Sequence, residues 1–113
     1  MNFFGEIEMQ GNQDSWLCKV DNCIFEAHHI RFDFAGVIRG DNFTGHCSAF
    51  FESEFLFNGM GQFRYAGYRG YEAPLSIRAK IIEGNLAISG TWFELGINYA
   101  ISGVLEPVSG LAG

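Results

Sequence analysis

Apolar and polar residues alternate with a period of two along almost the whole chain. Because successive side chains of a β-strand point to opposite faces of the sheet, this alternation is typical of strands with one buried face. It is clearest in the last third, where three segments place these residues on one face: Ile77, Ala79 and Ile81; Leu86, Ile88, Gly90 and Trp92; and Ile97, Tyr99, Ile101, Gly103 and Leu105. No segment carries apolar residues at the 3.6-residue spacing of a helix over three turns. The sequence therefore predicts an all-β protein.

Short polar or glycine-containing pairs separate these segments and favour hairpin turns. We expect two-residue turns at Asp21-Asn22, Gly40-Asp41, Gly84-Asn85 and Leu95-Gly96, and a longer hairpin loop at residues 58–61. The apolar face changes parity between Ala27 and Ile30, which predicts a bulge or a short corner near His28-His29. Residues 67–74 are expected to form the one substantial loop.

The number and spacing of the segments predict the architecture. Roughly eight to ten short strands are typical of a sandwich or a barrel. Short hairpins between consecutive strands favour an up-and-down meander, and closure of the meander would pair both edge strands. We therefore predict a small antiparallel β-barrel. An open sheet or a sandwich paired in a dimer is the alternative.

A short pattern recurs in the chain. Residues 38–45 (IRGDNFTG) are similar to residues 82–90 (IEGNLAISG) with one residue inserted, and Ile101-Ser102-Gly103 repeats the end of the pattern. An apolar residue and a hydroxyl residue followed by glycine suit a barrel strand that bends or packs closely at the glycine. The alternative is that β-hairpins converge on these residues. The hairpins and this pattern resemble those of the calycin group, the lipocalin-like and avidin-like barrels, although the chain has no diagnostic family motif. The resemblance implies a calycin-like barrel.

Composition fits one folded domain that covers residues 1–113. Hydrophobic residues make up 48% of the chain and charged residues 18%, which suits a folded core and argues against disorder. The formal net charge of −6 argues against nucleic acid as a partner, because phosphate binding needs a basic surface. No signal peptide and no membrane-spanning run is recognisable, so we expect no membrane association. The odd number of cysteines then favours the cytoplasm.

Cysteine and histidine side chains are the candidate metal ligands: Cys18, Cys23, His28, His29, His46 and Cys47. Neighbouring residues of a strand point to opposite faces, so neither His28-His29 nor His46-Cys47 can place both side chains on one ion. If Asp21-Asn22 is a turn, Cys18 and Cys23 are diagonal neighbours, too far apart for an easy disulfide. The spacings match no zinc pattern. We therefore expect buried thiols, no metal site and no cofactor.

Catalytic candidates are few. Glu26, His28 and Asp33 lie close in the sequence, and a histidine next to a carboxylate can act as a general base. A surface contact between a glutamate and a histidine is the commoner role of such residues, and no nucleophile motif or phosphate-binding loop is present. We therefore expect a binding protein rather than an enzyme.

Four aromatic residues are the candidate ligand-binding residues. Trp92 and Tyr99 fall on the expected inward faces of adjacent strands, and Phe63 and Tyr65 fall on the inward face of another. A barrel of eight or more strands has room for one small ligand, so these rings predict a mostly apolar pocket for a small molecule. The alternative is that the four rings fill the interior themselves.

Surface aromatics support a different function. Tyr68 and Tyr71 lie in a segment that interleaves aromatic residues with arginine. Such rings can stack against the apolar face of a sugar, or form a contact in a homodimer or with another protein. Carbohydrate binding or protein interaction is therefore the alternative to a ligand inside the barrel.

Overall fold

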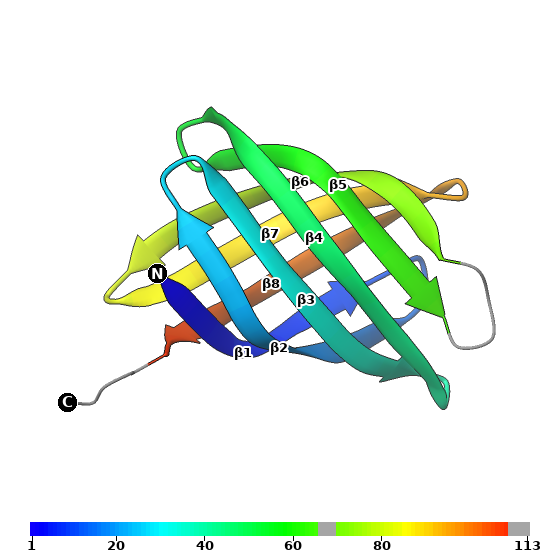
Figure 1. The fold of residues 1–113 in the computed structure, drawn as a ribbon. Helices are drawn as coiled ribbons and strands as arrows, with labels where there is room; N and C mark the ends of the chain where they lie inside the picture. The colour runs from blue at the N-terminus through cyan, green and yellow to red at the C-terminus, as the bar shows by residue number, and fades with distance from the viewer. Residues whose placement is uncertain (66–69, 109–113) are drawn as a thin grey trace.

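The computed structural model describes residues 1–65 and 70–108. They form eight strands: β1 (Asn2–Gln10), β2 (Ser15–Glu26), β3 (His29–Ile38), β4 (Asp41–Ser53), β5 (Leu56–Tyr65), β6 (Tyr71–Ile82), β7 (Asn85–Glu94) and β8 (Ile97–Pro107). Each strand pairs antiparallel with the next, and β8 pairs with β1, so the sheet closes into a barrel (Figure 1). The predicted up-and-down barrel is confirmed, and an open sheet or a sandwich is excluded.

The connections alternate between the two ends of the barrel. The N-terminus and the turns after β2, β4 and β6 lie at one end, on the left in Figure 1. The opposite end holds the connections β1–β2 (residues 11–14), β3–β4 (residues 39–40) and β7–β8 (residues 95–96). We call this opposite end the barrel mouth.

The alternating pattern places the apolar residues inside the barrel. In β8, Ile101 and Leu105 are buried, whereas the intervening Ser102 is exposed. Phe51 and Ile81 share the inward parity of their strands but are exposed, because each lies within two residues of the strand end away from the mouth. Inward parity therefore predicts burial in the middle of a strand better than at its ends.

Three hairpins have two-residue turns with positive φ at both central residues, as type I′ turns require. These turns are Arg39-Gly40 (φ 51° and 84°), Glu83-Gly84 (52° and 85°) and Leu95-Gly96 (52° and 80°). The last lies where the sequence predicts it. The other two lie one residue before the predicted position, because glycine takes the second central position of the turn rather than the first.

The predicted turn at Asp21-Asn22 is wrong, because β2 continues through both residues. Between Lys19 and Cys23 the register with β3 shifts by one residue, so a bulge lies here and changes the inward parity between Val20 and Cys23. The chain turns instead at Ala27-His28, where a bulge or corner was expected. The parity change expected between Ala27 and Ile30 comes from this two-residue turn, which pairs Phe25 with Ile30.

The predicted loop at residues 58–61 is also wrong. Strand β5 runs through these residues, and the turn lies at Glu54-Phe55. A β-carbon at Gly59 would collide with the carbonyl oxygen of Ser48 on β4, and one at Gly61 would lie 2.6 Å from the Phe63 ring. These glycines allow close packing inside the barrel wall and do not mark a turn.

Only part of the predicted loop at 67–74 can be compared with the structure. Residues 67–69 lie outside the described residues. Tyr71 to Pro74 belong to β6, so the described part of this prediction is wrong from residue 71 onward.

Candidate functional site

The four predicted ligand-binding residues meet inside the barrel near its mouth. The rings of Phe63 and Trp92 stack with centroids 4.4 Å apart and planes at 13°, and Trp92 stacks on Tyr99 at 4.6 Å and 8°. Tyr65 packs against Phe43 at 4.9 Å. Phe63 and Trp92 are completely enclosed, whereas Tyr65 and Tyr99 are partly exposed. The rings thus cover one another's faces, and only the two tyrosines remain accessible from the mouth.

One carboxylate is buried beside this stack. The Trp92 indole Nε1 donates a hydrogen bond of 3.1 Å to Glu94 Oε1. Burial raises the pKa of Glu94, and the hydrogen bond from Trp92 opposes this shift. Burial also raises the pKa of Tyr65, with smaller contributions from Glu94 and Tyr99. The part of the barrel interior near the mouth therefore combines flat apolar rings with a few polar atoms.

A pocket of about 550 Å³ opens at the barrel mouth, and Tyr65 and Tyr99 are among the residues that line it. Trp16 forms part of its wall and meets Tyr99 edge to face, with ring centroids 6.3 Å apart. The ion pair Arg39–Asp14, 2.6 Å long, joins the β3–β4 turn to the β1–β2 loop at the rim. The sequence did not reveal the roles of Trp16, Arg39 and Asp14, because the start of β2 and the two connections meet only when the barrel closes.

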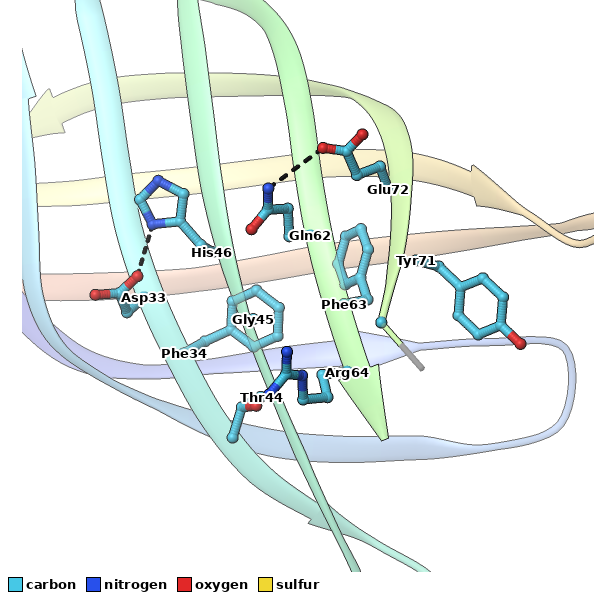
Figure 2. A pocket seen from close by; sticks show the side chains of 11 residues that line it. Asp33, Phe34, Thr44, Gly45, His46, Gln62, Phe63, Arg64, Tyr71 and Glu72 are labelled. Atoms are coloured by element: carbon cyan, nitrogen blue, oxygen red, sulfur yellow. Dashed lines mark hydrogen bonds and ion pairs between the residues drawn. The ribbon is translucent and has the colours of Figure 1, made fainter. Parts of the chain in front are cut away.

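A second pocket, of about 640 Å³, lies on the outer wall across β3, β4, β5 and β6 (Figure 2). Asp33, His46, Gln62 and Glu72 are direct cross-strand neighbours in one row. His46 Nδ1 lies 2.6 Å from Asp33 Oδ1, and Gln62 Nε2 donates a hydrogen bond of 3.3 Å to Glu72 Oε2. Arg64 and Tyr71 also line this pocket, which we call the outer groove.

The structure separates the residues of the predicted acid–base group. Asp33 lies beside His46 on β4, whereas His28 lies in the turn that follows Glu26. The pairing of Asp33 with His46 follows from a turn centred on Arg39-Gly40. A turn centred one residue later would pair Asp33 with Ser48 instead, so the misplaced turn hid this contact. The neighbours Gln62 and Glu72 depend on longer connections whose register the sequence does not reveal.

All three cysteines are free and buried, as predicted. The expected placement of Cys18 and Cys23 as diagonal neighbours across a turn is wrong, because both lie on β2 and pair with Gly36 and Phe32 of β3. His46 is partly exposed on the outer face while the adjacent Cys47 is fully buried, as strand alternation requires. Among residues 1–65 and 70–108, no group of three or more histidine, cysteine or acidic side chains is placed to hold a metal ion.

We expect the unfolding free energy to fall as the pH rises above about 9, because unfolded thiols then begin to lose their protons. Burial raises the pKa of Cys18 to about 11 and that of Cys23 to about 12. The folded state therefore holds these protons more tightly than the unfolded state. The resulting stabilisation is complete below pH 9 and is lost as the pH rises through these folded values. Urea unfolding at a series of pH values measures the effect.

Cys23→Ala is the matched control, and its stability is expected to fall less steeply over the same pH range. Equal slopes for the variant and the wild type would contradict a raised pKa at Cys23.

Comparison of the chain with protein-family models, with curated proteins and with solved structures finds no match. In the part of the chain that the structure describes, no helix is long and apolar enough to cross a lipid bilayer.

Proposed function

We propose that the protein binds a small, flat, mostly apolar and uncharged molecule at the barrel mouth, without catalysis. The observation that carries the proposal is the pocket of about 550 Å³ whose wall includes Trp16, Tyr65 and Tyr99. Its volume lies in the range of small-molecule sites, which are mostly apolar with a few polar groups. Tyr99 ends the buried aromatic stack, so a flat ligand at the mouth would extend an existing series of rings.

The charges at the rim argue against an anionic ligand. Asp14 and Asp41 both line the pocket, and Arg39, which is already paired with Asp14, is the cation among its lining residues. A ligand with a negative group would meet excess negative charge there. Hydroxyl or carbonyl groups suit this rim better, because the tyrosines and the ion pair can exchange hydrogen bonds with them. We keep the cytoplasm as the proposed compartment, in line with the three free thiols.

Fluorescence titration with N-phenyl-naphthylamine, an uncharged apolar fluorophore, tests this proposal. We expect saturable binding that changes the emission of Trp16 in a Trp92→Phe variant, since Trp16 lines the pocket. Tyr99→Leu should weaken binding about fivefold, because an aromatic contact contributes about 1 kcal/mol. The anionic analogue anilinonaphthalene sulfonate should bind more weakly than the uncharged probe.

Phe93→Leu is the matched control, because Phe93 is an exposed aromatic residue that does not line the mouth pocket. Its binding should equal that of the wild type. Equal weakening by Tyr99→Leu and Phe93→Leu, or no saturation at all, would contradict a site at the mouth. Either result would favour the alternative function, in which exposed rings such as Phe50 and Phe93 contact another protein or a second copy of this chain.

A further inference from the structure

The outer groove is a polar hollow on the outside of the barrel wall. Its four-residue row of Asp33, His46, Gln62 and Glu72 crosses four strands in register. The outward-facing row beside it is Arg31, Ser48, Met60 and Pro74, so its polar side chains end at β4, whereas those of the groove row continue to β6. The volume of about 640 Å³ is sufficient for a small molecule.

Hydrogen bonds within the row hold its side chains and leave other polar atoms for a ligand. An ionised carboxylate only accepts hydrogen bonds, so His46 Nδ1 donates to Asp33 and Nε2 is directed elsewhere. Gln62 donates through Nε2 to Glu72, which leaves its carbonyl oxygen as an acceptor. The row therefore combines acceptor oxygens with a histidine nitrogen.

Donors and an aromatic ring complete the lining. Arg64 lies one row closer to the mouth, next to Thr44 on β4, and its guanidinium lies beside Thr44 in Figure 2. Tyr71 lies at the end of the groove and is 38% exposed, and its ring points away from the polar row in Figure 2. A guanidinium offers up to five donors, while an exposed phenol ring offers a flat apolar face.

This combination suits a ligand with many hydroxyl groups. A hydroxyl both donates and accepts, so it can bind carboxylates, an amide and a guanidinium in the same small space. Two carboxylates against one arginine disfavour a phosphate or another anion. We propose that the outer groove is a saccharide-binding site, separate from the pocket at the barrel mouth.

Nuclear magnetic resonance titration of the isotope-labelled full chain tests this proposal. The probes are glucose, galactose, mannose and N-acetylglucosamine, each added separately. At least one sugar should cause saturable shifts of backbone amides at residues 44–46, 62–64 and 71–72. Residues 11–16 and 39–41 at the mouth should not shift, which distinguishes this site from the one proposed above.

Two variants give the contrast. Gln62→Ala should weaken sugar binding about fivefold, because it removes hydrogen bonds from the middle of the row. Asn58→Ala is the matched control, because it removes an amide on the same strand that binds Ser76 outside the groove. Its sugar binding should equal that of the wild type, and both variants should keep the dispersed spectrum of a folded barrel.

The results of this titration decide whether the outer groove binds a saccharide. Saturable shifts at the groove that Gln62→Ala weakens and Asn58→Ala preserves would support the proposal. No saturable shift with any of the four sugars, shifts confined to the mouth, or equal binding by Gln62→Ala and the wild type would overturn it. None of these results depends on whether N-phenyl-naphthylamine binds at the mouth.

Discussion

Replacing Ile101 with aspartate is expected to prevent stable folding. Ile101 is 2% exposed and lies between Met9 of β1 and Gly90 of β7 in the closed barrel wall. An unpaired carboxylate at such a position costs several kcal/mol, which is comparable to the whole stability of a small domain, about 5–15 kcal/mol. Circular dichroism and urea unfolding of Ile101→Asp should show loss of the cooperative transition.

Ser102→Asp is the control for this prediction, because residue 102 points to the outside of the same strand. The new carboxylate would lie beside Glu8 on β1, and the repulsion between two exposed like charges costs only a few tenths of a kcal/mol, up to about 1. We expect a cooperative transition close to that of the wild type. Similar damage from both substitutions would contradict the assigned faces of β8.

Gly59→Ala is expected to lower the unfolding free energy by about 3 kcal/mol, the cost of overpacking a tight interior. Its β-carbon would lie 2.6 Å from the Ala49 Cα and would also collide with the Ser48 carbonyl oxygen. Both obstacles are main-chain atoms of β4, which cannot move away without disturbing the Gly59–Ala49 pairing. The midpoint of urea unfolding measures the loss.

Gly84→Ala provides the contrast for Gly59→Ala. Gly84 has a φ of 85°, and a β-carbon there would meet no atom within 4 Å. The substitution therefore adds only the strain of a left-handed backbone, about 1–2 kcal/mol, without a collision. A smaller loss for Gly59→Ala than for Gly84→Ala would show that β4 and β5 are not closely packed at this point.

The pattern of faces along the strands could be predicted from the sequence. Trp92 and Ile101 lie inside the barrel as their parity predicts, and the turn at Leu95-Gly96 is in place. Alternation is a local property, since successive side chains of a strand point to opposite faces of the sheet. For the same reason, the opposite directions of His46 and Cys47 could be predicted without knowing any strand partner.

Several connections could not be predicted as reliably. Asp21-Asn22 suits a bulge as well as a turn, and Gly59 serves close packing where glycine more often marks a loop. In both cases the same residue types satisfy two backbone geometries. The neighbouring strand decides between them, because it either accepts the extra residue or excludes a side chain.

By itself the sequence determined that the chain is all-β, which side chains face inward, and that the strands connect as a meander. The tertiary structure decided the register, and therefore the sites. A change of one residue in the β3–β4 turn selects His46 or Ser48 as the partner of Asp33, and only closure of the barrel brings Trp16, Arg39 and Tyr99 to one mouth. It also decided that Phe63, Trp92 and Tyr99 stack on one another, because ring orientation depends on the distance across the barrel, which no single strand encodes.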